Sequence, residues 1–162
     1  MIIQSFRLKD FGIYGGEHEF DLAPVPRGLF NRPVVLFNGK NGVGKTTFVE
    51  AVRLCLHGPV ALGPRIGQQE YLDHLASRIH RPHSGMTPPS TSSLEMQFEH
   101  VGLGRRTQYR VLRRWKTHGR RVDHEVRIWE DGELLDVDDQ EQMEALLRDL
   151  VPPGLVDLFF FD

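Results

Sequence analysis

A glycine-rich loop directly follows an apolar run near residue 40, and this arrangement limits the possible folds of the chain. Residues 34–47 read Val-Val-Leu-Phe-Asn-Gly-Lys-Asn-Gly-Val-Gly-Lys-Thr-Thr. The spacing Gly39-x4-Gly44-Lys45-Thr46 is typical of a phosphate-binding P-loop, which connects a buried strand to a helix. We therefore expect a buried strand over Val34–Phe37 and a helix over Thr46–His57, stopped by Gly58-Pro59, within an α/β fold.

Each residue type in the loop has a chemical reason to be there. The glycines allow positive φ angles, so that successive backbone N–H groups point inward toward an anion. Lys45 can reach the β- and γ-phosphates, and the Thr46 hydroxyl is a hard oxygen ligand for Mg2+. We expect ATP and Mg2+ to bind at residues 38–47, namely Asn38, Gly39, Lys40, Asn41, Gly42, Val43, Gly44, Lys45, Thr46 and Thr47. The alternative is a glycine-rich turn that binds nothing.

Composition indicates one ordinary globular domain over residues 1–162. Hydrophobic residues make up 40% of the chain and charged residues 26%, which is enough apolar material for a core. The single cysteine, Cys55, cannot form an intrachain disulfide, which favours a reducing, cytoplasmic setting. No signal peptide or membrane span is evident, so we expect no membrane partner.

Charge is strongly segregated in the second half of the chain. Residues 101–121 contain eight Lys or Arg and no acid, whereas residues 122–149 contain eleven acids against two arginines. The first block overlaps an alternating strand, Thr107–Thr117, which directs Arg110, Arg114 and Lys116 to one face. Such a face could bind the phosphates of double-stranded DNA without reading sequence. The alternative is a solvated strand that the following acidic block partly neutralises.

The remaining elements are read from periodicity. Met1–Phe11 and Glu17–Leu22 alternate around Gly15-Gly16, which predicts an antiparallel hairpin. Two further helices are expected, and the strand Thr107–Thr117 should belong to a meander closed by an Asp131-Gly132 turn. The ranges are Gln68–Arg81 and Asp138–Leu150 for the helices and Ser93–His100, Thr107–Thr117 and Val122–Glu130 for the strands, with a loop over Pro82–Ser93. The sheet as a whole is expected to be mixed.

Three segments resemble a known family. The amino-terminal "KDFGIYGGEHEF", the loop "FNGKNGVGKTT" and the terminal "LFFFD" are similar to the amino-terminal ATPase lobe of SMC/RecF/SbcC-type DNA-processing ATPases, and most of all to those of bacterial DNA phosphorothioation systems. The resemblance implies an ABC/SMC-like P-loop head, in which this lobe joins a carboxyl-terminal lobe with a long coiled coil between them. It also implies a homodimer in which two heads enclose ATP, DNA as a partner, and other phosphorothioation subunits.

The sequence departs from the complete family pattern. It shows no Ser-Gly-Gly-type signature, no acidic pair after a buried strand, and no heptad stretch, so it reads as half of an ATP-hydrolysing head that lacks the carboxyl-terminal lobe and coiled coil. Many relatives carry a basic residue where Gly12 stands. Any phosphate contact from that position must therefore come from the backbone or from a neighbour.

Asp162 is the second candidate catalytic and metal-site residue, beside Lys45 and Thr46. Leu158–Asp162 fits a Walker B strand, four apolar residues followed by a carboxylate, whereas the resemblance places Asp162 at the Q-loop position, which we favour. Both readings put it near Mg2+ or the attacking water. The alternative is a strand end whose carboxylate faces solvent.

Two other functions remain open. One is a non-catalytic, nucleotide-dependent DNA-binding or dimerisation module of a repair or defence ATPase. The other is a small P-loop phosphotransferase, which the sequence disfavours because it shows no catalytic Asp near the loop and no arginine-bearing lid.

Overall fold

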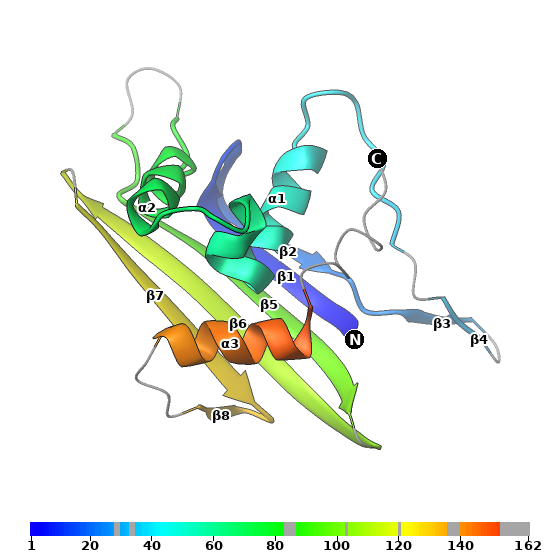
Figure 1. Ribbon diagram of the computed structural model, residues 1–162. Coiled ribbons are helices and arrows are strands. Elements are labelled where there is room, and N and C mark those ends of the chain that lie inside the picture. Colours follow the sequence, from blue (N-terminus) through cyan, green and yellow to red (C-terminus); the bar gives the residue numbers. More distant parts are fainter. Residues whose placement is uncertain are drawn as a thin grey trace.

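A six-stranded sheet forms the body of the protein, and helices α1, α2 and α3 lie on one of its faces (Figure 1). The computed structural model describes residues 1–27, 30–32, 35–82, 87–102, 104–119, 121–135 and 140–152. The strands are β1 (Ile2–Phe11), β2 (Tyr14–Asp21), β3 (Val25–Arg27), β4 (Phe30–Arg32), β5 (Thr91–Gly102), β6 (Arg105–His118), β7 (Arg121–Glu130) and β8 (Glu133–Leu134). The helices are α1 (Lys45–His57), the 3-10 helix η1 (Gly58–Leu62), α2 (Gln68–Ser77) and α3 (Gln140–Leu150).

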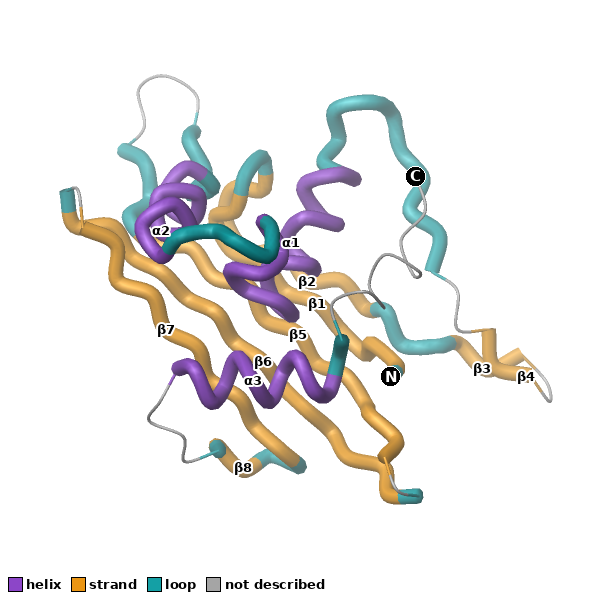
Figure 2. The backbone as a smooth tube through the Cα atoms, in the orientation of Figure 1, coloured by secondary structure: helices purple, strands orange, loops and turns teal. Residues whose placement is uncertain are grey.

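The sheet has the order β2-β1-β5-β6-β7-β8, while β3 and β4 form a separate ribbon (Figure 2). Each pairing among the described strands is antiparallel. The predicted meander is therefore confirmed as β5, β6 and β7, with a tight turn at Asp131-Gly132 in which both residues have positive φ. The parallel pairing that would make the sheet mixed is not seen among the described residues.

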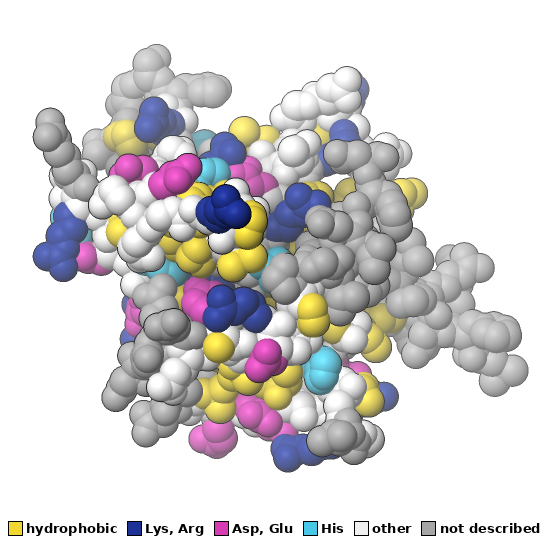
Figure 3. Space-filling view, in the orientation of Figure 1, with side chains coloured by type: hydrophobic (Ala, Val, Ile, Leu, Met, Phe, Trp, Pro, Cys, Tyr) yellow, Lys and Arg dark blue, Asp and Glu magenta, His cyan; other side chains and the backbone are white. Residues whose placement is uncertain are grey.

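The core lies between the sheet and the helices, because alternate strand residues point toward α1 and α2. On β6 this alternation buries Val111 and Trp115 and leaves Arg114 and Lys116 exposed, as the sequence predicts. The largest apolar contributors from the other elements are Phe6, Leu8, Phe11, Phe48, Leu54, Leu56, Tyr71, Leu75, Leu94 and Phe98. In the space-filling view of the helix-bearing side, hydrophobic side chains are interrupted by charged ones rather than gathered into one patch (Figure 3).

The helices follow the predicted ranges with small differences. α1 begins one residue before the predicted start and ends at His57, where Gly58 adopts a positive φ. α2 ends at Ser77, before the predicted Arg81, because Ile79 leaves the helix to form a bridge with Phe11 of β1. The start of the third predicted helix, at 138–139, lies outside the described residues. Of the described helices, none is long and apolar enough to cross a membrane.

Two local predictions are wrong. The first hairpin turns at Gly12-Ile13, and Gly15-Gly16 lies inside β2, because positive φ angles at Asp10 and Gly12 reverse the chain earlier. Residues 35–37 form no strand and are exposed, with Leu36 at 86%. A buried strand needs a hydrogen-bonding neighbour along each edge, and no strand of the described part pairs with 35–37. Val34 lies outside the described residues.

Candidate phosphate-binding site

The predicted P-loop residues lie together as an open turn in front of α1. Asn38, Gly39 and Lys40 are exposed and irregular, and the chain then turns at Asn41-Gly42. Gly42 and Gly44 have φ angles of 84° and 101°, which residues with a side chain rarely adopt. Both glycines therefore have the conformational role that the motif predicts.

Lys45 folds back over this loop. Its Nζ donates hydrogen bonds to the carbonyl oxygens of Gly39, at 2.8 Å, and Lys40, at 3.2 Å. These contacts hold the ammonium group across the mouth of the turn, among exposed backbone groups.

The first turn of α1 is suited to an anion. Gly44 is the N-cap residue, and no side chain caps the helix, so the first N–H groups have no side-chain acceptor. These groups carry the positive end of the helix dipole toward the loop. Thr46 lies in this turn and is exposed, which fits a hydroxyl that binds Mg2+ beside a phosphate.

The tip of the first hairpin braces the loop, a contact that sequence reasoning missed. The Tyr14 hydroxyl donates a hydrogen bond to the Gly44 carbonyl oxygen at 3.1 Å, and the same oxygen accepts the Phe48 N–H at 2.8 Å. A Cβ atom at Gly44 would lie 2.7 Å from Ile13 Cδ1 and 2.8 Å from the Tyr14 oxygen. Burial raises the pKa of the Tyr14 phenol, so its hydroxyl remains a donor at neutral pH.

The hairpin is itself anchored through Gly12. The Gly12 N–H donates to the Arg78 carbonyl oxygen at 2.7 Å, and the His80 Nδ1 donates to the Gly12 carbonyl oxygen at 2.9 Å. A Cβ at Gly12 would approach Thr47 Cγ2 to 2.6 Å. Gly12 therefore allows close packing of the hairpin on the P-loop helix. Since its N–H and carbonyl already have partners, it offers no free backbone group to a phosphate.

A buried ion pair fixes the far end of α1. Arg113 of β6 is 1% exposed, donates from Nε to the Cys55 carbonyl oxygen at 2.7 Å, and forms a forked pair with Glu144 of α3. Burial alone would lower the pKa of Arg113, but the hydrogen bonds and charge of Glu144 raise it above its usual value. Burial raises the pKa of the Cys55 thiol to about 12, so this cysteine stays protonated.

The basic strand lies on the opposite face of the sheet from the P-loop helix. Arg110, Arg114 and Lys116 share that face, as predicted, but their surroundings differ. The Arg110 guanidinium stacks on the Trp129 ring, 3.6 Å from its centroid, and Arg114 pairs with Glu125 at 2.5 Å. The acidic block therefore neutralises part of this surface.

Across the described residues no group of three or more His, Cys, Asp or Glu side chains is placed to hold a metal ion. Asp162, the other predicted metal-site residue, lies outside the described residues. Thr46, an exposed residue in the first turn of α1, stays a predicted Mg2+ ligand.

The fold and the loop together define a P-loop protein of the kind found in ATPase heads. The family profile AAA_23, described as an AAA domain, matches residues 5–150, and the chain belongs to this family. No curated protein matches the sequence.

A solved structure shows the same fold. The SMC head domain from Thermotoga maritima superposes with a TM-score of 0.54 at 17% sequence identity, over 90% of this chain. The match spans 42% of that structure's chain, so the present residues correspond to less than half of the SMC head domain. The architecture is therefore that of an amino-terminal lobe of an SMC-type head.

Proposed function

We propose that this lobe binds ATP with Mg2+ through residues 38–47. The observation that supports it most is Lys45, whose ammonium group is held over a loop with two left-handed glycines at an uncapped helix start. In this proposal the backbone N–H groups and Lys45 bind the phosphates, and Thr46 supplies a metal ligand. Mg2+ when bound would neutralise charge that develops on the transferred phosphoryl group.

The lobe would act as one part of a larger ATPase. By analogy with the SMC head fold, a carboxyl-terminal lobe and a second head would complete the nucleotide site, and Asp162 would lie near Mg2+ or the attacking water. ATP binding would then favour head engagement, which is a shift between two populations. We propose that the complete ATPase is cytoplasmic. It would act on double-stranded DNA through the face that carries Arg110, Arg114 and Lys116.

The specific process we propose is DNA phosphorothioate modification, with a role like that of the sulfur-modification protein DndD and with other subunits of such a system as partners. Its support is the resemblance of "KDFGIYGGEHEF" and "LFFFD" to those proteins. A nucleotide-dependent DNA-binding or dimerisation module without hydrolysis is the competing function. That alternative would be favoured if the lobe binds ATP and engages a second head, but does not hydrolyse ATP even when it is combined with its carboxyl-terminal lobe.

Calorimetry with ATP, with and without Mg2+, tests the nucleotide site. Lys45→Ala removes a charge and should weaken ATP binding under both conditions, whereas Thr46→Ala removes a metal ligand and should weaken it chiefly when Mg2+ is present. The isolated chain should release phosphate far more slowly than about 1 s−1, the low end for complete enzymes. Equal losses for the two variants with and without metal would contradict the assigned roles.

A further inference from the structure

The sheet face opposite the helices carries a row of side chains set by strand register. From β2 to β7 the row reads Glu17, Lys9, Ser93, Arg114 and Glu125, each directly opposite the next. Two long cations therefore flank one short serine. Strands in a sheet lie about 4.8 Å apart, so the two cationic side chains start roughly 10 Å from each other.

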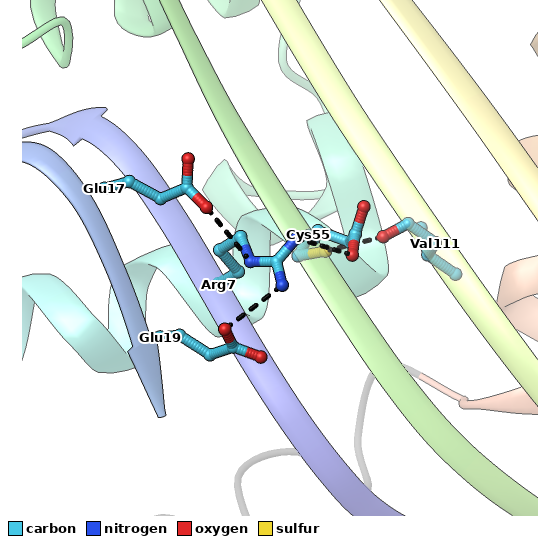
Figure 4. A network of polar contacts seen from close by, with 6 residues as sticks. Arg7, Glu17, Glu19, Cys55 and Val111 are labelled. Atoms are coloured by element: carbon cyan, nitrogen blue, oxygen red, sulfur yellow. Dashed lines mark hydrogen bonds and ion pairs between the residues drawn. The ribbon is translucent and has the colours of Figure 1, made fainter. Parts of the chain in front are cut away.

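The acid opposite Lys9 is engaged by another cation, Arg7, which lies two residues earlier on β1. Arg7 forms ion pairs with Glu17 at 3.3 Å, Glu19 at 3.1 Å and Glu95 at 3.6 Å (Figure 4). Glu17, which lies opposite Lys9, is thus turned toward Arg7. Within the described ranges no carboxylate lies in ion-pair distance of Lys9.

Lys116, one row further along β6, is in the same situation. It lies opposite Asp123 in the register, but Asp123 pairs with Arg121 at 2.9 Å and faces His118 at 3.6 Å. No ion pair of Lys116 is found in the part of the chain that the structure describes. Lys9 and Lys116 are therefore cations without an acidic partner among the described residues. Lys9 lies two strands from Arg114 in the same row, and Lys116 lies two residues further along β6. Arg114 itself pairs with Glu125.

A hollow of about 430 Å³ opens on this face, and Lys9, Ser93 and Arg114 are among its lining residues. Two more residues with hydroxyl groups, Ser90 and Thr91, also line it. Lys116 does not line it, but lies opposite Thr91, which does.

A backbone hydrogen bond ties Ser90 to β6, because the Ser90 carbonyl oxygen accepts the Thr117 N–H at 2.8 Å. Asp10 is the acid in the lining, and its Oδ1 already accepts the Gly16 N–H at 2.8 Å.

We infer that this hollow is a second phosphate-binding site, separate from the P-loop and on the other face of the sheet. Lys9 and Arg114 supply the charge, Lys116 adds to the local potential, and the serine and threonine hydroxyls supply neutral donors. The ligand is a phosphate group, carried either by a DNA backbone or by free phosphate. The DNA source rests on the proposed function, whereas the site itself does not.

The test uses the 162-residue chain with Lys45→Ala, so that the P-loop contributes little. Amide NMR spectra are recorded with inorganic phosphate and, at equal ionic strength, with chloride. Phosphate-specific shifts are expected at Thr91 and Ser93, and they should disappear in Lys9→Gln and persist in Lys9→Arg, which keeps the charge. The control is Arg106→Gln, which removes one charge from the same face of the sheet but at the far end of β6, where Arg106 pairs with Glu99 at 3.3 Å.

Duplex DNA provides the second arm. The slope of log K against log salt is negative for DNA binding. If the ligand is a backbone phosphate, Lys9→Gln should make this slope less negative by about 0.9, and Arg106→Gln should leave it unchanged. Phosphate shifts without DNA binding would support the site and assign it to free phosphate. Absence of both signals, or equal losses in Lys9→Gln and Arg106→Gln, would overturn the inference. ATP calorimetry on the unmodified chain tests the proposed function separately, and its failure would leave these results unaffected.

Discussion

The hydroxyl of Tyr14 and the carbonyl of Gly44 are joined by a 3.1 Å hydrogen bond, although 30 positions separate them in the sequence. This bond connects the tip of the first hairpin to the residue at which the P-loop becomes helix α1. The hairpin, which shows no phosphate-binding motif, therefore helps to fix the orientation of the loop.

Tyr14→Phe removes this bond and keeps the ring. Because a neutral hydrogen bond contributes about 1 kcal/mol to stability, we expect the melting temperature to fall by about 2–4 °C. Because this bond also orients the loop, we expect ATP affinity to weaken by up to about fivefold. Calorimetry and thermal melting on the same preparation measure both quantities. A lower melting temperature with unchanged ATP affinity would mean that Tyr14 serves the fold and not the loop.

Gly44→Ala should be more destabilising than Gly42→Ala. Both glycines have positive φ, but a Cβ at Gly44 would meet Ile13 and Tyr14 below 3 Å, whereas one at Gly42 would meet nothing within 4 Å. Gly42→Ala thus reports backbone strain alone, on the order of 1–2 kcal/mol, and Gly44→Ala adds the clash. Urea unfolding of the two variants measures the difference, and equal losses of stability would contradict this packing.

Glu144→Gln should destabilise the fold strongly, because it leaves the buried Arg113 charge without its counter-ion. Losses of this kind are about 3–5 kcal/mol. The double variant Arg113→Met/Glu144→Leu removes both charges and should recover much of that loss. Arg121→Gln, which affects an ion pair at an arginine that is 82% exposed, is the control and should cost less than about 1 kcal/mol. Urea unfolding of all three decides, and a loss in Glu144→Gln no larger than in Arg121→Gln would refute the role of the pair.

His124 should make stability depend on pH. Burial first, and then the charge of Arg113, lower its pKa from 6.5 to about 4. Between these two pH values His124 is protonated in the unfolded chain and neutral in the folded chain. The free energy of unfolding therefore falls as the pH drops from about 6.5 to about 4, by at most about 3 kcal/mol.

The difference between the wild-type chain and His124→Gln, measured by urea unfolding across this range, isolates the effect from other titrating groups. His118→Gln changes a half-exposed histidine and is the control. A pH dependence identical in wild type and His124→Gln would show that the imidazole is not buried in its neutral form.

Much of the fold follows from patterns local in the sequence. Helix α1 and strands β5, β6 and β7 are predictable because their apolar spacing and turn residues agree with their final surroundings. The P-loop is predictable for the same reason, since its glycines and Lys45 act within a few residues of one another. Its strand at 34–37 is not, because a buried strand depends on neighbours far away in the chain.

Arg113 shows a different kind of miss. Alternation on β6 buries positions 109, 111 and 115, so position 113 is expected on the same inward face. An arginine is rarely fully buried unless it is paired, so the residue type at position 113 argues against the inward face that the alternation predicts. The partner, Glu144, could not be deduced, because the docking of α3 on the sheet is a tertiary event with no local marker. The Tyr14 contact depends on how the hairpin tip packs on the loop, which has no local marker either. The surroundings of Lys9 and Lys116 among the described residues depend on strand register, which the sequence does not display.

The forked contact between Arg113 and Glu144 also determines where the polypeptide can be cut. A fragment that stops after β8 would lose the Glu144 carboxylate, and it would also uncover Arg113 and remove the buried Leu147 of α3 from the core. Such a fragment should collect in inclusion bodies or be degraded, even though its P-loop is complete. The smallest unit that can be produced for biochemical work therefore extends through α3, and α3 is part of the nucleotide lobe's foundation rather than an appendage.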